Sequence, residues 1–114
     1  MIDAWIQHPT ARHSDEPIFD SLRRWTKSDL TGTPSVADVV AVLDEAGVSQ
    51  ALTSARYAPR NVMISNDEVA AFVKESEGRL VGVGSVDITR PMEGTREIRR
   101  CINELGFKAI RLLP

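Results

Sequence analysis

The sequence predicts an α/β fold in which strands and amphipathic helices alternate to build a parallel sheet. Three glycines, Gly47, Gly78 and Gly106, each follow a helix-like stretch and come just before an apolar, strand-like stretch. They are 31 and then 28 residues apart, about the length of one strand–helix unit with its loops. Glycine suits the residue after a helix because a positive φ is needed there. Strands and helices in this order predict parallel strands joined by right-handed crossovers.

Four strands are expected, at residues 2–7, 48–54, 80–86 and 108–112. Four strands with three crossover helices are half of a (βα)8 barrel, which needs roughly 250 residues. At 114 residues the chain is at most one domain. We therefore expect residues 1–114 to be the N-terminal part of a single TIM-barrel domain, truncated after its fourth strand. Its outer strands would then have unpaired edges.

Apolar residues recur at helical spacing between these strands. Thr33-Pro34-Ser35 supplies start signals for the first helix, Ser65 and Glu68 form a capping-box pattern at the second, and Pro91 begins the third. The positions expected to face the core are Val36, Val39, Val40, Leu43 and Ala46 in the first helix, Val69, Phe72 and Val73 in the second, and Ile98, Cys101, Ile102 and Leu105 in the third.

The connection from His8 to Pro34 is much longer than a usual βα loop. Within it, residues 17–27 place apolar side chains at helical spacing, which predicts a short helix over the carboxyl end of the sheet. Two roles are open for this helix. It is a lid that excludes water from a site, or it is a surface helix docked on the fold.

Composition excludes several classes of protein. The formal net charge is −2, whereas nucleic-acid and anionic-membrane binders need a basic excess. No apolar run reaches the ~18 residues of a membrane span, and no signal peptide is recognisable at the start. The lone cysteine, Cys101, excludes an internal disulfide and reads as a small core residue. We expect a cytoplasmic protein that acts on a small molecule, and association into a homo-oligomer stays open.

The first strand and its end carry the polar residues of most interest. Alternation puts Asp3, Trp5 and Gln7 on one face of the strand, pointing into a barrel, and His8 follows at the rim. The second histidine, His13, lies in a polar loop. Its distance of five residues from His8 is no recognised ligand spacing. A structural role is the simpler explanation for each histidine.

Other candidates lie where the later strands end, which is where α/β folds bind ligands. Arg56 and Tyr57 follow the second strand, and an arginine there could clamp a carboxylate. Asp87 follows the third strand, and Arg111 lies near the end of the fourth. Ordinary solvated loop side chains are the alternative for each. Gly82 and Gly84 lie inside a strand, which indicates close packing and not a nucleotide loop.

Three stretches together resemble the amidohydrolase-related proteins, in the branch that includes aminocarboxymuconate-semialdehyde decarboxylase. They are Ile64–Phe72 (ISNDEVAAF), Gly78–Val86 (GRLVGVGSV) and Glu104–Arg111 (ELGFKAIR), after a first strand that begins Ile-Asp. The resemblance covers nearly the whole chain. It implies a (βα)8 barrel with a divalent metal, most often zinc, at its carboxyl face.

That family carries Ile-Asp-x-His-x-His in its first strand, and here Trp5 and Gln7 stand at the two histidine positions. Tryptophan cannot ligate a metal, and glutamine is a weak neutral ligand. The resemblance therefore implies a site that is impaired or rebuilt, with Gln7 and His8 as the remaining metal-ligand candidates of this half. The expected substrate-binding residues are Trp5, Arg56, Tyr57 and Arg111.

Three functions follow as hypotheses. The first is metal-dependent hydrolysis of a small organic substrate, by a metal-activated water. The second is non-oxidative decarboxylation on the same scaffold. The third is a barrel without metal that serves as a binding or structural protein. For either enzyme, residues 1–114 alone are expected to be inactive.

Overall fold

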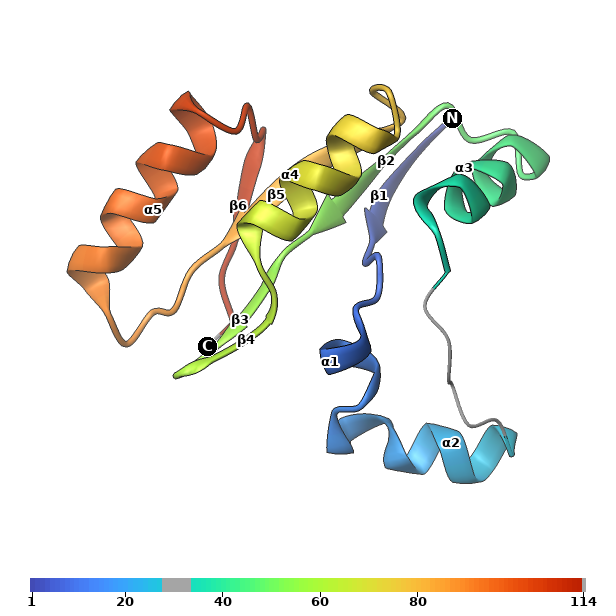
Figure 1. Ribbon diagram of the computed structural model, residues 1–114, viewed down its shortest axis with the longest axis horizontal. Coiled ribbons are helices and arrows are strands. Elements are labelled where there is room, and N and C mark those ends of the chain that lie inside the picture. The colour runs from blue at the N-terminus through green and yellow to red at the C-terminus, as the bar shows by residue number, and fades with distance from the viewer. Residues whose placement is uncertain (28–33, 114) are drawn as a thin grey trace.

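The computed structural model describes residues 1–27 and 34–113. A parallel sheet of four strands in the order β1-β2-β5-β6 runs through the molecule (Figure 1). The strands are β1 (Ile2–Ile6), β2 (Gln50–Ser54), β5 (Leu80–Ser85) and β6 (Ala109–Arg111). The four predicted strands are confirmed, and each end lies within two residues of its expected place.

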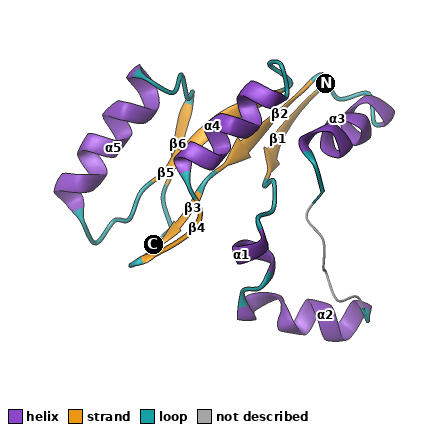
Figure 2. Cartoon of the chain, viewed as in Figure 1, coloured by secondary structure: helices purple, strands orange, loops and turns teal. Residues whose placement is uncertain are grey.

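Three helices connect these strands and lie beside the sheet (Figure 2). They are α3 (Val36–Glu45), α4 (Asn66–Glu75) and α5 (Pro91–Asn103). The capping box of Ser65 and Glu68 is confirmed at α4, and Ser35 forms an equivalent box with Asp38 at α3. Pro91 is the first residue of α5, as predicted. The predicted start signal Thr33 lies outside the described residues.

The glycines after the helices have the backbone conformation that was expected of them. Gly47, Gly78 and Gly106 have φ angles of 72°, 88° and 69°. An L-amino acid with a side chain is strained at such angles. The period of about 30 residues in the sequence therefore reports repeated strand–helix units.

The three helices bury their apolar stripes on one side of the sheet, in two clusters. One cluster centres on Leu43 and Leu80, and the other on Val69 and Phe107. Cys101 is fully buried in the second cluster, so the prediction of a core cysteine is confirmed, and burial raises its pKa to about 11. Ala46 and Ile102 are wrong as core residues. Ala46 is exposed at the C-terminal cap of α3, and Ile102 is 45% exposed because it lies one position past the buried stripe of α5.

Two glycines of β5 let the helix layer approach the strand closely. A Cβ on Gly82 would lie 2.3 Å from the ring of Phe107, and one on Gly84 would lie 2.9 Å from Sγ of Cys101. Close packing was the predicted role of these glycines, and it is confirmed.

An antiparallel hairpin that the sequence did not predict follows β2. Its strands are β3 (Arg56–Ala58) and β4 (Asn61–Ile64), which pair with each other and not with the main sheet. Arg60 has a φ of 58° in the turn between them, directly after Pro59. The four predicted strands do not include this stretch, although Val62, Met63 and Ile64 after a proline turn are a strand signal.

The long first connection contains α1 (Ala11–Ser14), the short 3₁₀ helix η1 (Pro17–Phe19) and α2 (Asp20–Thr26). The predicted helix is thus present, at the end of the molecule where β1 stops (Figure 1). Its apolar side chains are not packed on the sheet. Ile18, Leu22 and Trp25 are 66%, 40% and 84% exposed, which contradicts a docked surface helix. The role of a lid stays a prediction.

The first strand contains an irregularity that breaks its alternation. Asp3 pairs with Ala51 and Ile6 pairs with Thr53, so three steps along β1 match two along β2. Asp3 also accepts a hydrogen bond from the Trp5 N–H, at 3.0 Å. An extra residue of this kind shifts the faces of a strand. Asp3 therefore shares a face with Ile6, and the prediction that it shares a face with Trp5 is wrong.

Within residues 1–27 and 34–113, no helix combines the length and the apolar character that crossing a bilayer requires.

Candidate functional site

The carboxyl ends of β1, β2 and β6 bring several polar side chains to one end of the sheet. The long first connection and the β3–β4 hairpin lie at this same end (Figure 1). In α/β folds this is the end where ligands bind. Its principal side chains are Trp5, Ser54, Arg56 and Arg111, joined by His13 from the long connection.

Arg111 joins the fourth strand of the sheet to the first two. The central carbon of its guanidinium lies 3.9 Å from the centre of the Trp5 ring, a cation–π contact. Its Nη1 also donates a hydrogen bond to Oγ of Ser54, at 3.3 Å. Trp5 itself remains 56% exposed. Two of the residues predicted to bind substrate, Trp5 and Arg111, are therefore in direct contact.

The guanidinium of Arg56 is hydrogen-bonded to the imidazole of His13. Nη1 of Arg56 lies 3.2 Å from Nε2 of His13, and the two residues are 43 positions apart. A guanidinium can only donate hydrogen bonds, so His13 Nε2 is the acceptor and the imidazole is neutral, with its proton on Nδ1. Nε of Arg56 is buried and has no hydrogen-bond partner among the described residues.

The charges of this cluster repel one another. Burial, and then the charge of Arg56, lower the pKa of His13. Burial is also the main cause that lowers the pKa of Arg111, followed by the charge of Arg56. In the described part of the chain, neither arginine has an ion pair with a carboxylate. Two partly buried guanidiniums without a carboxylate partner have the chemistry that suits an anion.

The two metal-ligand candidates of the first strand do not come together as a metal site. His8 is 3% exposed, and its ring stacks on Phe72 of α4 with 4.2 Å between ring centres. It therefore lies under the helix layer, and its buried Nε2 has no hydrogen-bond partner among the described residues. Its role as a metal ligand stays a prediction. Gln7 has a buried Nε2 without a hydrogen-bond partner in the described residues. Over those residues, no group of three His, Cys, Asp or Glu side chains is arranged to hold a metal ion.

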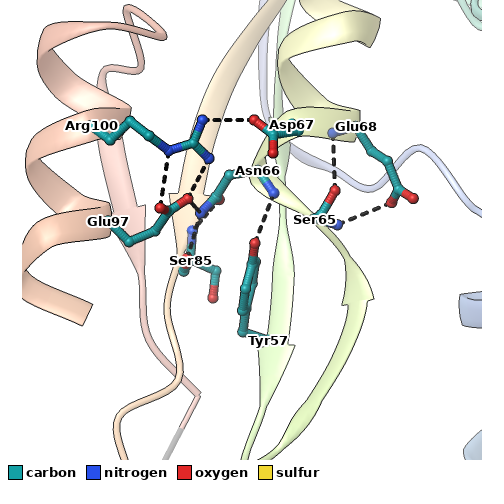
Figure 3. A network of polar contacts seen from close by, with 8 residues as sticks. All are labelled: Tyr57, Ser65, Asn66, Asp67, Glu68, Ser85, Glu97 and Arg100. Atoms are coloured by element: carbon teal, nitrogen blue, oxygen red, sulfur yellow. Dashed lines mark hydrogen bonds and ion pairs between the residues drawn. The ribbon is translucent and has the colours of Figure 1, made fainter. Parts of the chain in front are cut away.

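Tyr57 points into a polar network between α4, α5 and β5 (Figure 3). Its hydroxyl accepts a hydrogen bond from the Asn66 N–H at 3.1 Å, and burial raises its pKa. Arg100 joins α5 to this network through Glu97 and Asp67, at 2.6 and 2.7 Å. The contacts of Tyr57 are those of a structural residue, although its ring also lines a cavity of about 420 Å³ beside the hairpin.

The carboxylate of Asp87, just after β5, accepts hydrogen bonds within the turn that follows the strand. It accepts hydrogen bonds from the hydroxyl and the N–H of Thr89 and from the N–H of Arg60. These bonds, that from the Thr89 hydroxyl first, lower its pKa. In the described structure its carboxylate serves to fasten the hairpin to the end of β5.

The sequence does not predict that His13 belongs to this cluster. This histidine lies in a connection whose path cannot be read from hydrophobic periodicity. The only available signal was its rarity, since the chain contains two histidines. The contact with Arg56 depends on how the long connection folds back toward the hairpin.

Comparisons with known proteins support the fold and give a partial sequence relationship. No family model matches the chain. The 2-amino-3-carboxymuconate-6-semialdehyde decarboxylase of Dictyostelium discoideum is 38% identical over 47 residues, which are 41% of this chain and 13% of that protein.

The crystal structure of an uncharacterized TIM-barrel protein from Bordetella bronchiseptica matches 98% of this chain with a TM-score of 0.69, at 20% identity. The match spans 43% of that barrel. The chain therefore has the α/β fold of part of a TIM barrel, and a segment of it is similar in sequence to a decarboxylase.

Proposed function

We propose that the whole protein acts on a small organic substrate that carries a carboxylate, which Arg56 and Arg111 bind at the carboxyl end of the barrel. The observation that carries this proposal is a pair of partly buried guanidiniums at the same end of the sheet, one held by His13 and the other by Ser54 and Trp5, with no acidic partner among the described residues. Arginine binds carboxylates through paired, charge-assisted hydrogen bonds. The exposed ring of Trp5 beside Arg111 offers a flat surface to a conjugated or aromatic substrate.

The reaction that we propose is non-oxidative decarboxylation, which the sequence similarity to a decarboxylase supports. A carboxylate that leaves as carbon dioxide loses its charge during the reaction. Strong pairing of that group with two arginines would stabilise the substrate more than the transition state. The carboxylate bound by Arg56 and Arg111 is therefore an anchor, and the substrate needs a second carboxylate as its leaving group.

Metal-dependent hydrolysis is the second candidate, because the amidohydrolase-like resemblance implies it. The donors that this half would offer do not fit a divalent cation. His8 is packed on Phe72, Gln7 is neutral, and the two guanidiniums would repel a cation beside them. A metal centre would need its ligands from other parts of the whole protein. The third hypothesis, a binding protein without catalysis, uses the same anion site.

Binding of benzoate to the full-length protein tests the carboxylate site. Calorimetry is expected to show binding of benzoate and at least roughly tenfold weaker binding of benzamide, which has the same shape without the charge. Arg111→Gln and Arg56→Gln should each weaken benzoate binding by a similar factor. Arg99→Gln, which removes an exposed arginine of α5, is the matched control and should bind as the unmodified protein does. Equal affinity for benzoate and benzamide would contradict the proposal.

Release of carbon dioxide separates the two enzyme classes. The full-length protein would be incubated with unsaturated dicarboxylates and, separately, with esters and lactones of the same acids. We expect carbon dioxide from a dicarboxylate, with an increase in KM when Arg111 is replaced by Gln. Turnover of the esters or lactones alone would favour the hydrolase.

A further inference from the structure

The histidine of the long first connection is fixed in place next to the proposed carboxylate site. His13 is 7% exposed, and its Nε2 accepts the hydrogen bond from Arg56. The backbone N–H of His13 donates a hydrogen bond to Oγ1 of Thr10. The Thr10 hydroxyl in turn donates to the backbone carbonyl of Met63 on β4, at 2.9 Å. The His13 ring meets the ring of Phe19 edge-on, with 5.0 Å between centres. The imidazole is thus anchored to the hairpin that begins with Arg56.

Resting on the carboxylate site proposed above, we infer that His13 is a positioning residue of that site. It holds the guanidinium of Arg56 before an anion binds, and it takes up a proton from solvent once the anion is bound. The neutral imidazole accepts a hydrogen bond from Nη1 of Arg56, whereas Nε of Arg56 has no partner among the described residues. The direction of the guanidinium is therefore set before the ligand arrives, which lowers the entropy cost of binding.

The charges around His13 explain why its proton should follow the anion. Arg56 faces it from β3 and Arg111 from β6, and both disfavour the imidazolium, as does burial. Glu16, just before η1, favours the imidazolium more weakly than burial and Arg56 oppose it. These effects together lower the pKa of His13 below its ordinary 6.5.

A carboxylate between the arginines would cancel much of this repulsion and raise the pKa of His13 again. The protonated Nε2 would then donate to the anion, and Nη1 of Arg56 would be released to do the same. Binding of the anion and uptake of the proton are therefore linked, so each favours the other.

The experiment is calorimetric titration of the full-length protein with benzoate between about pH 5.5 and 8, where benzoate stays ionised and a histidine titrates. Affinity is expected to increase as the pH falls through the pKa that His13 has in the complex, by at most about tenfold per pH unit. His13→Gln keeps an oxygen acceptor for Arg56 and does not titrate. It should bind within about threefold of the unmodified protein at pH 8 and lose the pH dependence.

His8→Gln is the matched control, since the same substitution is made at a histidine that contacts Phe72 and not the arginines. It should keep the pH dependence. Titration of the unmodified protein in two buffers of different ionisation enthalpy gives the proton uptake without any variant, and a measurable fraction of one proton is expected near pH 7.

Two results overturn the inference while the carboxylate site stands. They are benzoate binding without proton uptake, and a pH dependence that His13→Gln leaves unchanged. Failure of benzoate to bind, or binding that does not respond to Arg56→Gln or Arg111→Gln, overturns the proposed site and this inference with it.

Discussion

Among the described residues, some buried polar side-chain atoms are fully paired and others have no partner. Asn66 is fully buried and uses both ends of its amide, with bonds to the backbone of Ser85 and to Glu97. Gln7, His8 and Arg56, near the carboxyl ends of β1 and β2, each keep a buried nitrogen without a partner in the described residues, and the hydroxyl oxygens of Thr53 and Ser85 are also buried and unpaired. Buried polar groups are nearly always paired in folded proteins. The unpaired nitrogens near the carboxyl ends of the strands are therefore available to a ligand or to a further part of the barrel.

Asn66→Ala should be among the most destabilising single changes in the chain. It leaves the N–H and the carbonyl of Ser85 unpaired in the interior, where each unsatisfied group costs about 1–3 kcal/mol. Urea unfolding is expected to give a loss of about 2–4 kcal/mol. Asn103→Ala, at the exposed end of α5, is the control and should change stability by less than about 0.5 kcal/mol. Similar losses for the two variants would contradict the structural role of Asn66.

Gly82→Ala and Gly94→Ala test the close approach of the helix layer to β5. A Cβ on Gly82 would lie 2.3 Å from the Phe107 ring, whereas on Gly94 the nearest atom would be 3.6 Å away, an ordinary contact. The first change should cost about 1–3 kcal/mol through overpacking. The second, inside α5, should gain about 0.5–1 kcal/mol from helix propensity. Equal effects on the urea midpoint would rule out the packing argument.

Hydrophobic periodicity, together with the residues that begin and end helices, predicted the repeated strand–helix units. The strands, the three crossover helices, the capping box at Ser65 and the glycine helix ends follow from local rules. The β3–β4 hairpin was missed because it interrupts the strand–helix order, and its positive φ falls on Arg60, a residue that gives no turn signal. The contact between His13 and Arg56 was missed because it depends on tertiary folding of the long connection.

Arg100 fastens α5 to α4, and its removal should change the acid stability of the fold. Hydrogen bonding to Arg100 is the main cause that lowers the pKa of Glu97 below its ordinary 4.5. A lowered pKa contributes stability above pH 4.5 that is lost as the pH falls through the lower, folded-state value. Arg100→Gln should therefore cost about 1–2 kcal/mol at pH 7 and give a shallower loss of stability between about pH 5 and 3.

Urea unfolding at several pH values measures this difference. Arg96→Gln, which replaces an exposed arginine on the same helix, should keep the acid slope of the unmodified protein. If the loss of stability with falling pH is the same in Arg100→Gln as in the unmodified protein, Arg100 does not lower the pKa of Glu97.

At the scale of the whole molecule, the helices cover one side of a sheet that has two free edges. Among the described strands, β1 and β6 each have one neighbour, and the fold matches 43% of a solved TIM barrel. The sequence predicted this half-barrel because each strand–helix unit repeats the same local pattern. The resemblance implied a divalent metal with Gln7 and His8 as candidate ligands, and this stays a prediction, because a barrel site is assembled from the ends of many strands.

Residues 1–114 expressed alone should associate with themselves. The edges of β1 and β6 carry unpaired backbone groups, and Trp5 and Ile2 are 56% and 61% exposed on the first strand. Free edges and exposed apolar side chains favour pairing between copies. Light scattering after size exclusion should give a mass above that of one 114-residue chain, whereas a stable monomer at ~100 μM would contradict the exposed edges.

A crystal structure of the full-length protein with benzoate tests the proposed carboxylate site most directly. We expect the benzoate carboxylate within hydrogen-bond distance of the guanidiniums of both Arg56 and Arg111, with its ring beside Trp5. A divalent metal held by Gln7 at the end of β1, or benzoate bound away from both arginines, would contradict it.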